Sequence, residues 1–494
     1  MTLLLQIAFI VFLIAGTSIF FHYTQWFLNI ISIIVCIHVL NRHTKAAYKL
    51  TWIFLIMLVP IFGGALYIFF HIVSNPRKFK HLLKQNIRES YGAFFLGGDC
   101  LPDLVRIYPE FRPQAHYLQE CAGFPLYTNT RSQYFDSGES YFRRVLTELE
   151  KARRYIFLEF FILKEGGMLN SIISILERKA GEGLDVRLMY DDLGCFMSLP
   201  PGFKEMMEKK GIKCFVFNPF RPILSSLQNN RDHRKLIVID GMVAFTGGLN
   251  IADEYINAVD RFGHWKDAAI MLEGEGAWPF SLIFLQMWNL QPGITDNYES
   301  FFPWNESPCE IQPDGFVQPY ADSPVDEENV GEHVYIQIIN KAKKYVYITT
   351  PYLIPDGTLI SALMLAAKSG VDVRIITPYR WDKRIVAFVS RSYYRQLISA
   401  GVKVYEYTSG FNHGKIFVCD DIIATVGTTN LDYRSLYLHF ECGVLIYRSE
   451  AVHAVKKDFL QTLPLSHRVT LKECARNAFQ RIASDLMRIF APLM

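Results

Sequence analysis

The pattern His-x-Lys-x-x-x-x-Asp occurs twice in this chain, and this duplication limits the folds open to it. The two copies consist of His233, Lys235 and Asp240, and of His413, Lys415 and Asp420. Each copy is followed, at the same distance from its histidine, by a glycine-containing turn that ends in asparagine, at Asn250 and at Asn430. Two copies in register predict two equivalent structural halves whose paired histidines share one active centre.

Weaker similarities extend the repeat beyond the motifs. Segment 152–159 resembles 342–349, segment 183–190 resembles 370–377, and segment 211–217 resembles 401–407. In each half, short apolar strands alternate with helical segments before the motif, which indicates an α/β unit with a largely buried sheet. We therefore predict two tandem α/β/α halves, residues 106–310 and 311–494, with one active site at their interface. They are joined within the proline-, aspartate- and serine-rich stretch 299–330.

The N-terminal region is apolar enough to enter a membrane. Its apolar runs are Leu3–Phe21, Trp26–Leu40 and Trp52–Val73. The first and third runs are long enough to cross about 30 Å of hydrocarbon as helices, whereas the second is short and could be a third span or part of a hairpin. We predict two or three transmembrane helices within residues 1–75, and Pro60 leaves open a broken or re-entrant third segment.

Two further segments have amphipathic patterns. Residues 76–105 are basic, and the stripe formed by Phe79, Leu83 and Ile87 predicts a helix on an anionic membrane surface, with an ordinary solvated helix as the alternative. A second apolar stripe, in the tail 471–494, is expected to pack against the protein body. The basic cluster after the last apolar run is larger than the one before it, which favours a cytoplasmic catalytic part.

Strand geometry divides the motif into two parts. Alternate residues of a strand share a face, so His233 and Lys235 point the same way while Asp240 points away. The second copy has the same parity, and both aspartates, although part of the catalytic motif, are therefore expected to serve the scaffold. Histidine can act as nucleophile or general acid, and lysine with an asparagine amide can bind phosphoryl oxygens. Two such sets predict a phosphate-processing site that needs no metal and no nucleotide.

A catalytic histidine usually has a hydrogen-bond acceptor on its second ring nitrogen. We expect Glu441 to take this role in the second half and Asp267 to take it in the first half, with Glu254 as the second choice there. His439 has no comparable sequence context, so we expect a structural role for it. Nine scattered cysteines, without a C-x-x-C pair, indicate neither a metal site nor a disulfide framework.

These segments resemble the phospholipase D superfamily, and in particular its bacterial cardiolipin synthases. The resemblance covers nearly the whole chain and is carried by segments 232–241 (DHRKLIVIDG), 244–255 (AFTGGLNIADEY), 350–356 (TPYLIPD) and 427–436 (GTTNLDYRSL). Three positions, Asn412, Gly414 and Lys266, depart from the residues usual in that family. None of these departures falls on an inferred catalytic atom.

The resemblance implies a phosphatidyltransferase that converts two phosphatidylglycerols to cardiolipin and glycerol without a cofactor. It implies that His233 attacks phosphorus to form a phosphatidyl-histidine and that His413 acts first as acid and then as base. The motif lysines and the two asparagines would hold the phosphoryl oxygens. The protein would then be a multi-pass protein of the bacterial cell membrane, in contact with phosphatidylglycerol, cardiolipin and an anionic bilayer surface, and not with nucleic acid.

Other functions are weighed against this one. A membrane phospholipase D would use water as the acceptor and release phosphatidic acid. A nucleic-acid phosphodiesterase is disfavoured by the apolar N-terminal region and by a net charge of only +3. A non-enzymatic scaffold is disfavoured because every motif position is intact. The sequence does not distinguish phosphatidylglycerol from phosphatidylethanolamine as the second lipid, and it does not give the oligomeric state.

Overall fold

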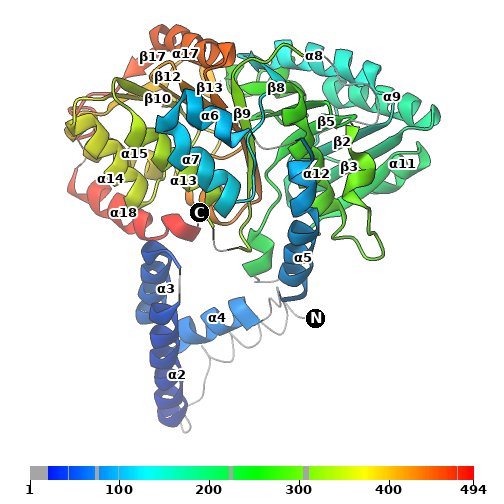
Figure 1. Ribbon diagram of the computed structural model, residues 1–494. Helices are drawn as coiled ribbons and strands as arrows, with labels where there is room; N and C mark the ends of the chain where they lie inside the picture. The colour runs from blue at the N-terminus through cyan, green and yellow to red at the C-terminus, as the bar shows by residue number, and fades with distance from the viewer. Residues whose placement is uncertain are drawn as a thin grey trace. The chain divides into compact units, whose positions relative to one another are not determined.

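The computed structural model (Figure 1) describes residues 21–42, 44–72, 77–97, 100–221, 226–303, 311–326, 328–475 and 477–493. The described residues fall into two compact units. The larger unit is formed by 79–219 and 231–475, and it contains both large sheets. The smaller unit combines the described parts of 1–78, 220–230 and 476–494.

A mixed seven-stranded sheet forms the first half of the larger unit, with the strand order β1-β8-β6-β5-β2-β3-β4. Its strands are β1 (Thr130–Phe135), β2 (Tyr155–Phe160), β3 (Asp185–Asp191), β4 (Lys213–Phe217), β5 (Lys235–Ile239), β6 (Val243–Gly247) and β8 (Ala269–Gly274). Strands β2, β3 and β4 run parallel, and β5 returns antiparallel beside β2. All residues of β2 and β5 are buried, as expected for strands that are covered on both faces.

The second half repeats this arrangement in an eight-stranded sheet with the order β17-β12-β11-β10-β14-β15-β16-β9. Its strands are β9 (Phe316–Asp322), β10 (Tyr345–Thr349), β11 (Asp372–Pro378), β12 (Lys403–Tyr407), β14 (Ile416–Cys419), β15 (Ile423–Gly427), β16 (Glu441–Tyr447) and β17 (Ser466–Arg468). From β9 to β12 the order matches that of the first sheet from β1 to β4, strand for strand. The predicted α/β fold with two equivalent halves is confirmed.

Helices cover both sheets and join them. The covering helices are α8 (Gly138–Lys151), α9 (Gly167–Gly181) and α11 (Phe203–Lys209) in the first half, and α13 (Val330–Lys341), α14 (Gly357–Lys368), α15 (Arg384–Ser399) and α17 (Glu450–Thr462) in the second. Between the sheets, α12 (Trp278–Trp288) is buried along its entire length and contacts β2, β5 and β9 (Figure 1). It belongs to a hydrophobic core with residues from both sheets, so the two halves fold as one unit.

Helix α5 (Arg77–Phe94) packs onto this core with the stripe that the sequence assigns to lipid. Leu83 is buried, and the ring of Phe79 lies 6.2 Å from that of Phe217 and 6.3 Å from that of Phe440. Ile87 packs against the same core. The prediction that this stripe lies on a membrane surface is wrong, because helical periodicity marks a buried face without indicating whether protein or lipid covers it.

The smaller unit contains the helices α2 (Phe21–Asn41), α3 (Ala46–Leu58), α4 (Pro60–Ile72) and α18 (Ala478–Ile489). The Thr51 hydroxyl of α3 donates to the carbonyl of Ile489 (2.6 Å), which joins the C-terminal helix to the N-terminal ones. The apolar stripe of α18 is nevertheless open to solvent, since Ile482 is 68% exposed and Leu486 is 45% exposed. The expected packing of this stripe against the protein body is therefore wrong for these two residues.

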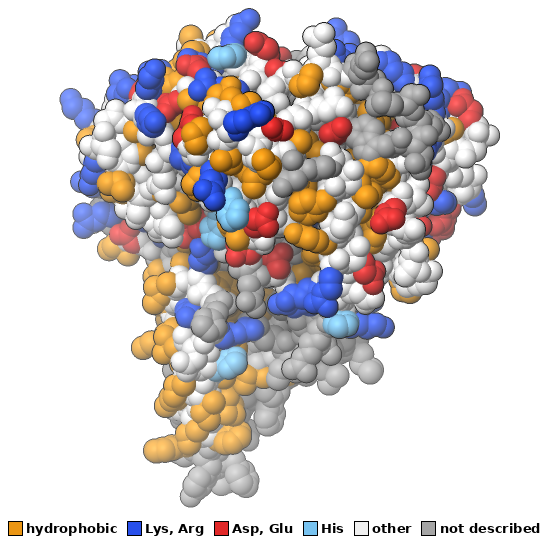
Figure 2. Space-filling view, in the orientation of Figure 1, with side chains coloured by type: hydrophobic (Ala, Val, Ile, Leu, Met, Phe, Trp, Pro, Cys, Tyr) orange, Lys and Arg blue, Asp and Glu red, His pale blue; other side chains and the backbone are white. Residues whose placement is uncertain are grey.

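Among the described residues, none of the helices has the length and apolarity that a membrane span requires. The third apolar run is divided between α3 and α4, which have 13 residues each, because Pro60 cannot continue the helix that ends before it. A single continuous helix over this run is wrong, and the break that Pro60 left open is found between α3 and α4. Hydrophobic side chains gather on the surface of α2 and α3 (Figure 2). The run Leu3–Phe21 lies outside the described residues except for its last residue.

Candidate active site

His233 reaches the second half of the protein through its backbone. It stands just before β5, and its N–H donates to the carbonyl of Phe440 (3.0 Å), while the N–H of Phe440 donates to the carbonyl of Arg231 (2.9 Å). Glu441 follows Phe440 and opens β16, and its two carboxylate oxygens lie 2.9 and 3.1 Å from Nδ1 of His233. The carboxylate beside the first histidine thus comes from the second half.

His413 has the equivalent arrangement in the opposite direction. The strand before it, β13 (Gly410–Asn412), pairs in parallel with β7 (His264–Lys266) of the first half. The N–H of His413 then donates to the carbonyl of Lys266 (2.7 Å). Asp267 follows Lys266, and its Oδ2 lies 2.8 Å from Nδ1 of His413. Each histidine therefore meets a carboxylate from the other half of the repeat.

The two carboxylates are exchanged relative to the prediction. The sequence assigns Asp267 to His233 and Glu441 to His413, and both assignments are wrong. A repeat shows which residues are equivalent but not which half a side chain faces, and here the interlocking backbone contacts decide. Glu254, the second choice for the first half, forms ion pairs with two basic side chains outside the motifs.

The motif aspartates contact neither histidine. Asp240 and Asp420 follow their strands with φ of 53° each, in the left-handed region of turns. The Asp240 carboxylate accepts the backbone N–H groups of residues 153–155 at 2.8–2.9 Å. Asp420 accepts those of residues 343–345 at 2.6–2.9 Å. These contacts tie the end of each motif strand to the start of its neighbour, β2 or β10.

Both motif lysines are buried beside their histidines. Nζ of Lys235 donates to the carbonyl of His233 (2.6 Å), and Nζ of Lys415 donates to the carbonyl of His413 and lies 3.0 Å from its Nδ1. Burial lowers the pKa of Lys235 to about 8 and the pKa of Lys415 to about 7. An anion bound between these amines would stabilise their protonated forms.

The two asparagines differ in how far their amides are already engaged. Oδ1 of Asn250 accepts the N–H of Ile162 (3.0 Å), and its Nδ2 donates to the hydroxyl of Tyr255 (2.7 Å). Asn430 has a long contact from Nδ2 to Asp432 (3.5 Å), and its Oδ1 has no hydrogen-bond partner among the described residues. Both side chains are buried, and the amide of Asn430 is the more available to a ligand.

Burial keeps both imidazoles neutral in the free site. Burial, followed by the charge of Lys235, holds the pKa of His233 well below its usual value. Burial, with the charge of Lys415, lowers the pKa of His413 to about 4. Near pH 7 each imidazole therefore carries one ring N–H and one lone pair.

The partner carboxylates differ in their affinity for a proton. Burial raises the pKa of Glu441 well above its usual value. Burial also acts to raise the pKa of Asp267, but the charges of His413 and Lys415 and the hydrogen bond from His413 outweigh it and hold that pKa below its usual value. Asp267 thus keeps its negative charge more firmly than Glu441, and a positive charge is better stabilised on His413 than on His233.

The turns after the motifs contain two residues that the sequence analysis missed. Gly248 and Thr428 occupy equivalent positions (248 − 233 = 15; 428 − 413 = 15). A Cβ at Gly248 would lie 1.9 Å from Oδ1 of Asp267, so glycine leaves the room that the carboxylate needs. The Thr428 hydroxyl donates to the carboxylate of Glu441. An alignment of the two turns could have identified these positions, because the first half has glycine where the second half has a residue with a hydroxyl group.

Two more polar groups near His233 were not assigned to the site from the sequence. The buried Arg231 pairs with Asp191 (3.0 Å), and Asp191 also accepts the N–H of Asp232 (3.0 Å), which holds the segment in front of the motif. His439, for which we expected a structural role, lies beside the first histidine, with ring centroids 5.5 Å apart.

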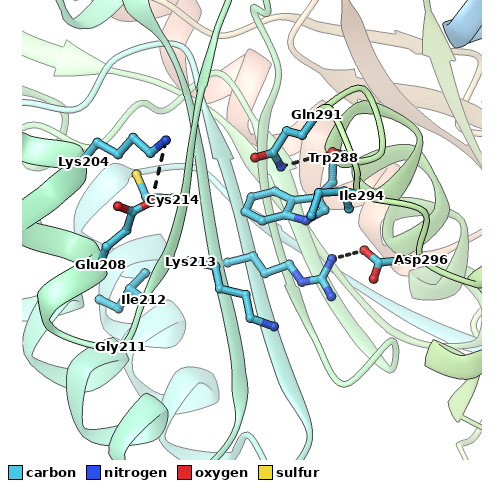
Figure 3. A pocket seen from close by; sticks show the side chains of 11 residues that line it. Lys204, Glu208, Gly211, Ile212, Lys213, Cys214, Trp288, Gln291, Ile294 and Asp296 are labelled. Carbon is cyan, nitrogen blue, oxygen red and sulfur yellow. Dashed lines mark hydrogen bonds and ion pairs between the residues drawn. The ribbon is translucent and has the colours of Figure 1, made fainter.

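A cavity of about 410 Å³ lies elsewhere, between β4 and the end of α12 (Figure 3). Its lining includes Arg187, Lys204 and Lys213, but Arg187 pairs with Asp296 and Lys204 pairs with Glu208 (3.7 Å). The charged side chains largely neutralise one another, and no motif residue lines the cavity. We assign it no catalytic role.

Known proteins resemble this chain in sequence and in fold. The family described as "Cardiolipin synthase, PLD-like domain" matches residues 335–463, and "Phospholipase_D-nuclease N-terminal" matches residues 27–70. An uncharacterized protein of Streptococcus mutans is 43% identical over 93% of this chain and 99% of its own length. The cardiolipin synthase of Alkalihalophilus pseudofirmus is 35% identical over 94% of this chain and 92% of its own. The structure of a phosphatidylserine synthase from Haemophilus influenzae aligns over 77% of this chain and 97% of its own, with a TM-score of 0.57 at 16% identity, which shows a shared fold.

Proposed function

This chain belongs to the cardiolipin synthase family of the phospholipase D superfamily, and we propose that it transfers a phosphatidyl group between two phosphatidylglycerols. The products are cardiolipin and glycerol. One phosphodiester replaces another, so no external energy source is required. The observation that carries the proposal is the crossed pair of histidine–carboxylate contacts, with a buried lysine beside each histidine.

In the first step His233 is the nucleophile. Its Nδ1 faces Glu441, so the lone pair lies on Nε2, which attacks the phosphorus of the first phosphatidylglycerol. The bond between phosphorus and the headgroup oxygen breaks, and His413, which takes up a proton on Nε2 when the anionic lipid binds, gives that proton to the headgroup oxygen, so glycerol leaves. His413 can act as the acid because the negative charge of the bound phosphodiester raises the pKa of the neighbouring imidazole in the complex.

In the second step His413 is the base. It takes the proton from a hydroxyl of the second phosphatidylglycerol, whose oxygen attacks the phosphatidyl-histidine. The bond between phosphorus and Nε2 of His233 breaks, and cardiolipin is released. The firmly ionised Asp267 supports this division of roles, because it stabilises the imidazolium that His413 forms in each cycle, whereas Glu441 leaves His233 neutral.

Positively charged and amide groups hold the phosphoryl oxygens. Lys235 and Lys415 supply the charge, and Asn430 supplies an amide that the protein leaves largely unengaged. Asn250 takes part through the second hydrogen of an amide whose first hydrogen is given to Tyr255. Asp240 and Asp420 stay outside the chemistry and hold the motif strands in place.

The protein works at the bacterial cell membrane, with its catalytic part on the cytoplasmic side. The N-terminal match to the phospholipase D family and the exposed apolar side chains of α2, α3 and α18 support this location. Cys121 of the larger unit is exposed, so its accessibility to a thiol reagent shows on which side of the membrane the catalytic part lies. A membrane-impermeant thiol reagent should modify Cys121 only after the cells are lysed. Modification in intact cells would place the catalytic part outside.

The product profile of the purified protein tests the proposed reaction. With phosphatidylglycerol as the only lipid, we expect cardiolipin and glycerol in equal amounts. His233→Asn should abolish both products. Formation of phosphatidic acid without cardiolipin would reject the synthase and support the alternative, hydrolysis by a membrane phospholipase D. Adding phosphatidylethanolamine to the assay shows whether that lipid can replace one phosphatidylglycerol.

A further inference from the structure

His439 is a buried imidazole whose polar atoms are not satisfied by the protein. It is 8% exposed, and neither ring nitrogen has a hydrogen-bond partner among the described residues. Buried side-chain nitrogens are nearly always hydrogen-bonded in folded proteins, so an unpaired imidazole indicates an unmet ligand. The ring lies against that of His233, with centroids 5.5 Å apart, and its Nδ1 is 3.9 Å from Oε1 of Glu441.

Three donor groups converge at this position. His233, His439 and Glu441 each offer one ligand atom, and these atoms lie within 4.8 Å of one another. Bonds of about 2.0–2.2 Å to a tetrahedral ion place its donor atoms roughly 3.3–3.6 Å apart. The contacts of 2.9 Å and 3.9 Å to Oε1 of Glu441 lie on either side of this spacing, and side-chain rotation would have to bring the remaining pair of donor atoms, which lies within 4.8 Å, to the same spacing. Within the described part of the chain, no other cluster of three such donors meets the same criterion.

The donor types select the class of ion. Two imidazoles and one carboxylate suit Zn²⁺, Co²⁺, Ni²⁺ or Cu²⁺, whereas Mg²⁺ and Ca²⁺ prefer oxygen ligands throughout. The carboxylate of Glu441 compensates one positive charge of the ion. The positive charge of Lys235, which lies beside His233, disfavours binding of the ion. We therefore expect weaker binding than at a structural zinc site, and a site whose occupancy follows the concentration of free metal.

We propose that His233, His439 and Glu441 bind a divalent transition-metal ion such as Zn²⁺, and that the bound ion inhibits phosphatidyl transfer. Inhibition rests on the proposed function, in which His233 is the nucleophile. An ion on Nε2 would occupy the lone pair that attacks phosphorus. An ion on Nδ1 would leave the proton on Nε2 and displace the hydrogen bond to Glu441. In either geometry His233 loses its nucleophilic lone pair.

Metal binding is measured directly with Co²⁺, which has visible absorption bands when it is bound in a tetrahedral or five-coordinate site. Chelator-treated, full-length, detergent-solubilised enzyme without an affinity tag is titrated with Co²⁺. We expect one ion per chain in the wild-type protein and at least a tenfold weaker affinity in His439→Asn. His467→Asn is the matched control, because His467 also faces a carboxylate, Glu473 (2.7 Å), but in an exposed pair. A wild-type protein without these bands, or equal affinities in the wild-type and His439→Asn proteins, would overturn the site.

Inhibition is measured separately, as the rate with added Zn²⁺ divided by the rate of the same variant in chelator. The Zn²⁺ concentration for half-inhibition should rise at least tenfold in His439→Asn and stay unchanged in His467→Asn. Normalising to each variant's own rate removes any effect of the substitution on folding or turnover. Co²⁺ binding without cardiolipin formation would reject the proposed function and leave the metal site standing. If Zn²⁺ inhibits cardiolipin formation equally in the wild-type and His439→Asn proteins, the proposed inhibition through this metal site is overturned.

Discussion

The crossed pairing of histidines and carboxylates makes a kinetic prediction for Asp267→Asn. Asp267 is 1% exposed, and its Oδ2 lies 2.8 Å from Nδ1 of His413, so the substitution removes the charge partner of a buried imidazolium. Breaking such a pair costs about 3–5 kcal/mol. With roughly 1.36 kcal/mol per tenfold change in rate, kcat for phosphatidylglycerol should fall about 10²–10⁴-fold.

A substrate with a good leaving group separates the two histidines. Phosphatidyl-p-nitrophenol releases a phenolate that needs no proton from His413, so its first step should depend on the proposed nucleophile, His233, alone. In Asp267→Asn, the initial burst of p-nitrophenolate should keep nearly the wild-type rate, while the later turnover stays slow because the second lipid hydroxyl still requires a base. In Glu441→Gln the burst itself should be slow, because Glu441 orients His233.

The p-nitrophenolate bursts of Asp267→Asn and Glu441→Gln together test which carboxylate serves which histidine. If Asp267→Asn slows the burst as much as Glu441→Gln does, the assignment of Asp267 to the acid–base histidine is refuted. If only Asp267→Asn slows it, the roles of His233 and His413 are reversed. Circular dichroism and thermal melting of both variants show whether a lost burst has a structural cause. Asp240→Asn, at a motif carboxylate that touches neither histidine, serves as a control with a normal burst.

The buried lysines predict a loss of activity at high pH: since the pKa of Lys415 is about 7 and that of Lys235 about 8, their positive charge is present below this range and lost above it. The pH profile of kcat/KM, which reports the free enzyme, should therefore fall through these values, and a profile that stays flat well above pH 8 would contradict an electrostatic role. Gly248→Ala places a methyl group 1.9 Å from a carboxylate oxygen of the site; overpacking of this kind costs roughly 1–3 kcal/mol, so we expect about a 5- to 150-fold loss of transfer activity, and wild-type activity would show that the carboxylate can move freely. Asp240→Ala and Asp420→Ala each leave three backbone N–H groups without their acceptor, and should lower the free energy of unfolding by about 2 kcal/mol; a loss of activity at an unchanged melting temperature would instead indicate a catalytic role.

The local parts of this structure follow from the sequence. The repeated strands and helices and the strand after each motif histidine are found as predicted, because hydrophobic periodicity and turn residues act over a few neighbouring positions. The break in the third apolar run likewise follows from a local cause, the missing N–H and fixed φ of Pro60. The two amphipathic stripes show the limit of such reasoning. Leu83 is covered by protein and Ile482 is exposed, the reverse of what we predicted, although both stripes have helical spacing.

The sequence by itself singled out most of the proposed site: two histidines, two lysines and two asparagines, each recognisable because it occurs in a duplicated pattern, and the two carboxylates Asp267 and Glu441. Only the tertiary structure decided how they combine. Glu441 faces His233 and Asp267 faces His413 because the backbone of each motif hydrogen-bonds to the other half, a contact between residues about 150 to 200 positions apart. The same exchange brings His439 beside His233, the proposed nucleophile. Covalent order carries no information about such contacts, which form when the two halves bury their common core and align their strands across it.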